Sequence, residues 1–89
     1  MSSTSDTIAY SEIWAVPMER LADFFAREGC PLAGGEYRRA QLQIRVTPYD
    51  IKVLCGREMP RCRVEISGEK EAAAKLHRRF ELTFLSAGG

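Results

Sequence analysis

The sequence has no long hydrophobic run, since none of its apolar stretches approaches the ~20 residues that a helix needs to cross a bilayer. It also has little cysteine, with three residues at irregular spacing. An odd number without framework spacing argues against a secreted disulfide scaffold. The polar start, Met1 to Asp6, does not have the charged-then-apolar order of a signal peptide. We therefore expect a cytoplasmic protein that does not contact a membrane.

An excess of charge of one sign is missing as well. The chain has 13 basic and 12 acidic residues, a net charge of +1, so its overall charge favours neither nucleic acid nor membrane as a partner. Its hydrophobic content of 45% is that of an ordinary globular protein. Its 89 residues suit one domain. We expect this domain to span residues 7–85, between a disordered tail at 1–6 and a flexible tail at 86–89.

Motifs for catalysis or cofactor binding are also lacking. No nucleophile motif accompanies His77, the one histidine, which we interpret as a partly exposed structural residue. Gly34-Gly35 is not followed by the Lys-Ser/Thr of a phosphate loop. The possible zinc ligands do not have zinc-site spacing: Cys30, Cys55, Cys62 and His77. We expect no enzymatic activity, no cofactor and no metal.

Hydrophobic spacing predicts a first helix over residues 17–28. Pro17 suits the first turn of a helix, and Gly29 followed by Pro31 indicates its end. Apolar residues at helical spacing form a stripe that should face the core, made of Met18, Leu21, Ala22 and Phe25. The Pro and Gly content of residues 30–36 predicts a loop.

Three stretches of alternating residues predict three half-buried strands, which we join into a three-stranded meander over residues 40–67. A type I turn centred on Pro48-Tyr49 and a loop over Arg57–Pro60 place the apolar residues in common rows. In this register Cys55 lies opposite Cys62. The three apolar rows run across the strands: Leu42, Cys55 and Cys62; Ile44, Val53 and Val64; and Val46, Ile51 and Ile66.

A second helix should begin after Ser67 as N-cap. Its core stripe is Ala72, Ala73, Leu76, Phe80 and Phe84. Residues 81–85 also alternate, so an edge strand there is an open alternative, and residues 8–16 contain another optional strand. The expected fold is α+β, a two-layer sandwich with an antiparallel sheet of three to five strands and two helices on one face. If both optional strands form, the arrangement is ferredoxin-like.

Local charge indicates a binding surface. Residues 36–63 carry seven basic and three acidic groups, whereas residues 1–28 carry two basic and five acidic groups. On the predicted solvent face, Arg45 and Lys52 are near neighbours and Arg63 lies across from Lys52. We therefore expect a small non-catalytic adaptor that binds an acidic protein partner through Arg45, Lys52, Arg61 and Arg63.

Two further kinds of partner remain open at this stage. RNA or DNA is the weaker alternative, because stacking on bases requires aromatic residues and none is expected on this face. A homodimer is the other, formed through apolar residues outside the core stripes: Phe24, Leu54, and Leu82 or Leu85.

Two resemblances accompany this interpretation. The order helix, three strands, helix resembles double-stranded RNA-binding domains, but Glu69-Lys70-Glu71 stands where that family has a Lys-Lys pair, and we do not infer membership. The terminal Gly88-Gly89 resembles the end of ubiquitin-like sulfur carriers and protein modifiers, whose diglycine carboxylate is adenylated and loaded. This resemblance implies a sulfur-carrier function as a third alternative, and chance glycines at a chain end are the other explanation.

Overall fold

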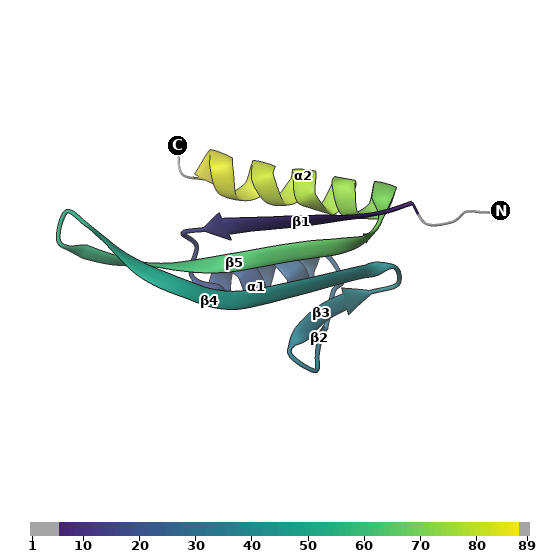
Figure 1. Cartoon of the computed structure of the whole chain (residues 1–89), viewed down its shortest axis with the longest axis horizontal. Helices are drawn as coiled ribbons and strands as arrows, with labels where there is room; N and C mark the ends of the chain where they lie inside the picture. The colour runs from purple at the N-terminus through teal and green to yellow at the C-terminus, as the bar shows by residue number, and fades with distance from the viewer. Residues whose placement is uncertain (1–5, 88–89) are drawn as a thin grey trace.

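The described part of the chain consists of a five-stranded antiparallel sheet and two helices, which is an α+β fold (Figure 1). The computed structural model describes residues 6–87, so the predicted diglycine site at 88–89 and most of the predicted N-terminal tail lie outside the described residues. The strand order in the sheet is β1-β5-β4-β3-β2. The elements in chain order are β1 (Thr7–Trp14), α1 (Met18–Arg27), β2 (Leu32–Ala33), β3 (Glu36–Arg39), β4 (Leu42–Leu54), β5 (Arg57–Glu69) and α2 (Lys70–Ala87).

The first helix forms as predicted, with one correction to its buried face. Leu21 and Phe25 are fully buried, but Met18 at the helix start is exposed. Phe24 is only 7% exposed, so the prediction that it contributes to an interaction surface is wrong. Its ring packs edge-on against Phe25 and against Phe80 of α2, with centroids 5.2 and 5.5 Å apart. The core therefore takes a wider arc of α1 than the spacing indicated, because α2 packs beside it.

The N-terminal half contains more strand than expected. The optional strand over 8–16 forms as β1 and pairs with β5 along its whole length, from Thr7 opposite Glu69 to Trp14 opposite Cys62. The loop predicted over 30–36 is wrong in part, because β2 and the start of β3 form a small hairpin there. Its turn is Gly34-Gly35, where both residues have positive φ angles of 62° and 83° that glycine adopts without strain.

The three-stranded meander predicted over 40–67 is wrong: this segment forms one long hairpin of β4 and β5. No turn occurs at Pro48-Tyr49, and the register shifts between Pro48 and Asp50, where β4 has a bulge. The chain turns instead at Cys55-Gly56, both at positive φ (52° and 76°), so that Leu54 pairs with Arg57. The predicted loop over 57–60 belongs to β5. Cys62 consequently lies opposite Pro48 and not opposite Cys55.

The second helix begins later than predicted, and its end, which the sequence pattern leaves open, lies at Ala87. Ser67 lies in β5 and does not cap the helix; the carboxylate of Glu69 accepts hydrogen bonds from the backbone N–H groups of Glu71 (3.1 Å) and Ala72 (3.0 Å). These contacts lower the pKa of Glu69. The helix continues through 81–85, so the alternative edge strand does not form. A ferredoxin-like arrangement required that strand.

One hydrophobic core joins both helices to a single face of the sheet. The sheet contributes alternate residues of β4 and β5, and Phe80 of α2 lies at the centre, with its ring against those of Trp14, Phe24 and Phe84. The fully or nearly fully buried side chains are Leu21, Phe25, Cys30, Leu42, Ile44, Cys62, Val64, Ile66, Ala73, Leu76 and Phe80. Among the described residues, neither helix combines the length and the hydropathy needed to cross a bilayer.

Candidate functional site

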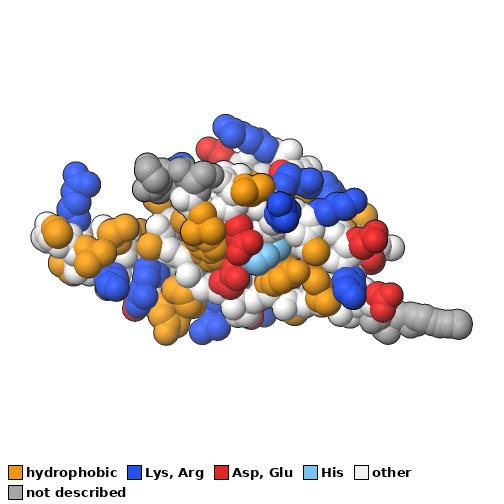
Figure 2. Space-filling model, turned by 90° about the horizontal axis from the view of Figure 1, so that it is seen from above, with side chains coloured by type: hydrophobic (Ala, Val, Ile, Leu, Met, Phe, Trp, Pro, Cys, Tyr) orange, Lys and Arg blue, Asp and Glu red, His pale blue; other side chains and the backbone are white. Residues whose placement is uncertain are grey.

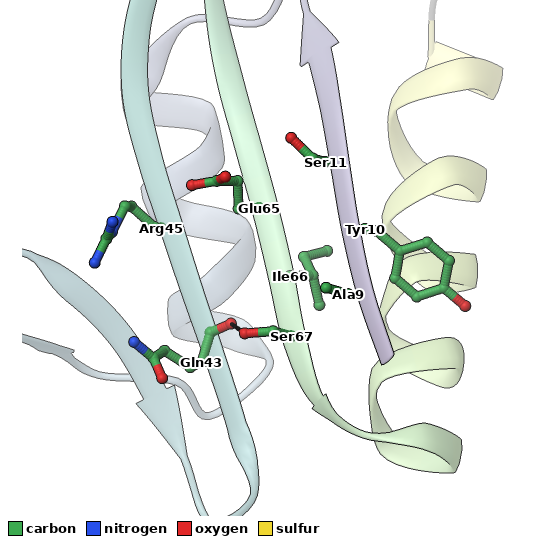
Figure 3. Close-up of a pocket in the computed structure, with 8 residues that line it drawn as sticks. All are labelled: Ala9, Tyr10, Ser11, Gln43, Arg45, Glu65, Ile66 and Ser67. Atoms are coloured by element: carbon green, nitrogen blue, oxygen red, sulfur yellow. Dashed lines mark hydrogen bonds between the residues drawn. The ribbon is translucent and has the colours of Figure 1, made fainter. Parts of the chain in front are cut away.

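The sheet face opposite the core, which we call the open face, is the first candidate surface. Because strand residues alternate, the side chains between the buried ones in β1, β4 and β5 point to this face. Small residues of β1 and β5 leave a shallow hollow of about 260 Å³ on it (Figure 3). The residues around the hollow are Ala9, Tyr10, Ser11, Gln43, Arg45, Glu65, Ile66 and Ser67.

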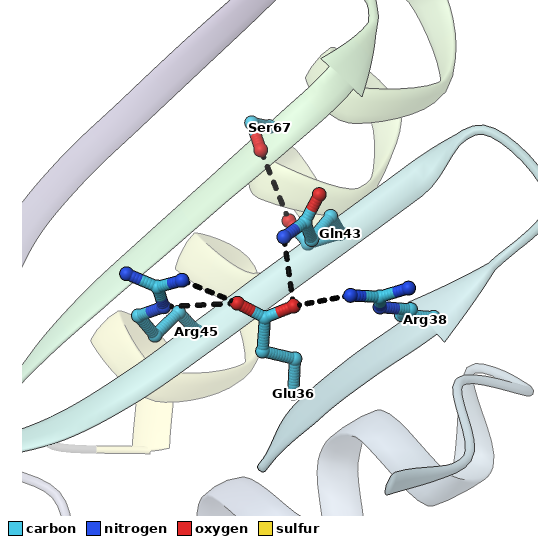
Figure 4. A network of polar contacts seen from close by, with 5 residues as sticks. All are labelled: Glu36, Arg38, Gln43, Arg45 and Ser67. Carbon is cyan, nitrogen blue, oxygen red and sulfur yellow. Dashed lines mark hydrogen bonds and ion pairs between the residues drawn. The ribbon is translucent and has the colours of Figure 1, made fainter. Parts of the chain in front are cut away.

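A polar network at one side of the open face is centred on Glu36 of β3 (Figure 4). Oε1 of Glu36 accepts hydrogen bonds from Arg38 (2.9 Å) and from Gln43 Nε2 (2.7 Å). Oε2 accepts two from Arg45, at 3.0 and 2.6 Å. The Arg38 and Arg45 guanidinium groups lower the pKa of Glu36 to about 2. Arg45 is therefore already paired within the chain, and it links β4 to β3.

The far halves of β4 and β5 extend beyond the rest of the sheet, and we call residues 49–61 the arm (Figure 1). Pairing with β1 starts only at Cys62, and pairing with β3 involves only Leu42–Ile44 of β4. The outer edges of both arm strands are therefore unpaired among the described residues. Several apolar side chains of the arm are exposed, including Ile51 (61%) and Val53 (62%), and Tyr49 and Leu54 are exposed as well.

The bulge in β4 brings an aromatic side chain onto the open face. Tyr49 lies between two arginines of β5, with the guanidinium carbons of Arg61 and Arg63 each 5.5 Å from its ring centroid. Arg61 also forms a two-pronged salt bridge with Asp50, whose pKa this pairing lowers. The expectation that no aromatic residue lies on this face is wrong, because the bulge places Tyr49 and Asp50 together opposite Arg61.

The four predicted partner-binding residues lie on the open face, but in a different arrangement from the predicted one. Arg45 pairs with Glu65 across the strands, Lys52 with Met59, and Arg63 with Thr47. The cluster of Arg45, Lys52 and Arg63 therefore does not form. Among the described residues, Lys52, Arg57 and Arg63 make no salt bridge, whereas Arg45 and Arg61 do. The sequence pattern does not indicate Arg57 as a binding residue, because it predicts a loop over residues 57–60, whereas Arg57 lies in β5.

The three cysteines do not form a shared site. Cys30 and Cys62 are buried, Cys55 is exposed at the tip of the arm, and all three are free thiols. Burial raises the pKa of Cys30 and of Cys62, so both behave as small core residues. No protein-family model and no curated protein matches this chain.

Proposed function

We propose that the protein is a small non-catalytic binding module that contacts an acidic segment of a protein partner through the arm and the adjoining open face. One observation carries this proposal: a two-stranded ribbon that no helix covers exposes both apolar and basic side chains. Isolated two-stranded ribbons are at best marginally stable in water. A partner that covers the exposed apolar side chains of the arm stabilises it.

The charges of the arm and of the adjoining open face define the chemistry of the partner. Among the described residues, Lys52, Arg57 and Arg63 make no salt bridge, so they are available to carboxylates of another chain. Within residues 6–87, the outer edge of β4 beyond Ile44 has no strand beside it. An extended acidic segment can add to such an edge by main-chain hydrogen bonds while its side chains meet the basic groups.

Nucleic acid is the second candidate, and Tyr49 is the observation that favours it. An exposed aromatic ring between two arginines is the type of group on which a base stacks. We prefer a protein partner because Ile51 and Val53 are the most exposed of the large apolar side chains of the arm, and apolar side chains gain nothing against a phosphate backbone.

A second copy of the chain is the remaining protein partner, through Leu54 of the arm or Leu82 and Leu85 of α2, which are all exposed. Sedimentation equilibrium at high protein concentration measures this directly. The free thiols agree with the reducing cytoplasm, which we propose as the location of the protein.

The test is a triple charge reversal, Lys52→Glu, Arg57→Glu and Arg63→Glu. Its matched control is Lys70→Glu, Lys75→Glu and Arg78→Glu on α2, which changes the net charge equally at exposed positions. Arg45 is left unchanged because it holds Glu36. Each variant is titrated at low and high salt with a glutamate-rich peptide and with a single-stranded oligonucleotide.

We expect the arm variant to lose binding of the acidic peptide while the helix variant retains it. Equal binding by both variants contradicts the proposal. Oligonucleotide binding that Tyr49→Ala weakens, without peptide binding, assigns the arm to nucleic acid instead.

A further inference from the structure

A cluster of one histidine and two carboxylates lies where α2 packs beside β1, away from the arm and the open face. His77 and Glu81 belong to α2 and Glu12 belongs to β1. His77 Nε2 is 3.0 Å from Glu12 Oε1, and His77 Nδ1 is 3.8 Å from Glu81 Oε1. Figure 2 shows the only histidine of the chain at the molecular surface beside acidic side chains.

The local structure explains why these three side chains meet. His77 and Glu81 are four residues apart on a helix, so they share one face. Glu12 lies opposite Val64 in the sheet and therefore points to the side that the helices cover. Tyr10, which lies two residues before Glu12 and on the same side of β1, stacks on the imidazole of His77. The ring centroids are 3.9 Å apart and the ring planes are 5° from parallel. The stack fixes the plane of the ring.

The oxygen of Glu12 that contacts His77 also accepts a hydrogen bond from a residue of its own strand. Trp14 donates a hydrogen bond from its indole Nε1 to Glu12 Oε1 at 3.0 Å. Burial alone raises the pKa of Glu12, but the hydrogen bonds with His77 and Trp14 outweigh it and the pKa is lowered. These two hydrogen bonds hold the carboxylate of Glu12 in place, as partners of a metal-binding carboxylate do.

We propose that Glu12, His77 and Glu81 form a binding site for a divalent transition-metal ion, with Zn²⁺ as the representative. The three donor atoms lie within 4.8 Å of one another. Bonds of about 2.0–2.2 Å around zinc separate neighbouring donors by about 3.3 Å, so the His77–Glu12 pair already has a suitable spacing. Glu81 Oε1 lies beside the other ring nitrogen, Nδ1, and a rotation of its side chain, which is 41% exposed, would bring it to an ion bound at Nε2.

The donor set selects the class of metal. Two carboxylates provide the negative charge that a divalent ion balances, and an imidazole nitrogen favours zinc and its neighbours over magnesium and calcium. The exposed fractions of Glu12 (37%) and Glu81 (41%) give solvent, and hence the ion, access to the site. Water fills the remaining coordination positions.

The experiment uses the full chain with Cys55→Ser, because Cys55 is an exposed free thiol and cysteine sulfur is itself a zinc ligand. Zinc affinity is measured by competition with a chromophoric chelator, and the resonances of the single imidazole are followed by NMR during the titration. Glu81→Gln is the decisive variant, since its side chain is exposed and its loss leaves the core intact. Glu71→Gln, exposed on the same helix, is the matched control.

We expect one equivalent of zinc to bind, with shifts of the His77 ring nitrogens and an increase in the melting temperature. Glu81→Gln should weaken binding about tenfold or more, while Glu71→Gln leaves it unchanged. Absence of saturable binding at millimolar zinc, or equal affinity of the two variants, overturns the proposal and leaves the cluster as an internal ion pair only.

Discussion

Replacement of Phe80 by alanine tests whether the aromatic cluster holds the two helices on the sheet. Phe80 is fully buried, and its ring is close to those of Trp14 (5.0 Å), Phe84 (4.8 Å), Phe24 (5.5 Å) and Phe25 (5.9 Å). A fully buried Phe→Ala change costs about 3–5 kcal/mol, because the transfer free energy of the ring is lost and a cavity remains. Small domains have a total stability of about 5–15 kcal/mol, so most of the stability margin disappears.

Guanidinium denaturation followed by far-UV circular dichroism measures this loss. Tryptophan fluorescence is a poor probe here, because Trp14 packs edge-on against the ring that is removed. Leu85→Ala is the control on the same helix, since that side chain is 63% exposed, and we expect a change of about 0.5 kcal/mol or less. If Phe80→Ala costs less than about 1 kcal/mol more than the control, the central position of this ring is refuted.

Three further predictions follow from the structure. Gly68→Ala should lower the melting temperature far more than Gly34→Ala. A Cβ added at Gly68 lies 2.0 Å from the carbonyl oxygen of Gln41, whereas one added at Gly34 has no described atom within 4 Å. Equal losses of melting temperature contradict the close approach at Gly68. The pKa of Glu36 is lowered from 4.5 to about 2, so its ion pairs contribute stability that is complete above pH 4.5 and is lost as the pH falls toward 2. The urea midpoint should therefore fall less steeply over this pH range in Glu36→Gln than in the parent protein. One thiol should react rapidly with a disulfide reagent in the folded protein, and Cys55→Ser should remove that fast phase; two fast thiols contradict the burial of the other cysteines.

Both helices could be predicted from the sequence because each buries a stripe at helical spacing. Leu21 and Phe25 in α1, and Ala73, Leu76 and Phe80 in α2, are the buried residues that the spacing indicated. The class of fold followed from these stripes and the alternating segments. The width of the buried face of α1 could not be predicted, because Phe24 is buried by its contact with Phe80 of α2 and its position in the helical spacing does not indicate this contact.

The sheet register could not be predicted, because a bulge within one strand and a turn between two strands produce the same shift in the alternation of apolar residues. Apolar residues change from even to odd positions between Val46 and Ile51, and a turn at Pro48-Tyr49 accounts for this change as well as an extra residue within one strand does. Cys55-Gly56 was the signal for the actual turn, since a glycine suits the positive φ angles of a two-residue hairpin loop.

The candidate site was found only in part for the same reason. Alternation placed Arg45, Lys52, Arg61 and Arg63 on one face, and they do lie there. Their neighbours depend on the register, so Tyr49 and the salt bridge between Asp50 and Arg61 were missed. Glu36 was assigned to a loop, although it lies in β3, where its partners come from two strands.

The backbone hydrogen bonds of the arm should break more readily than those of the rest of the sheet. From Arg57 to Arg61, β5 has a neighbouring strand on one side only, whereas from Cys62 onward it lies between β1 and β4. Fraying that starts at the Cys55-Gly56 turn can therefore spread along the ribbon at little free-energy cost until it reaches the pair of Trp14 and Cys62. Amide hydrogens of the arm should exchange with deuterium long before those of the central β5 residues. A ligand that adds a strand to the arm then reveals its position as protection from exchange that begins at the tip and stops at this pair.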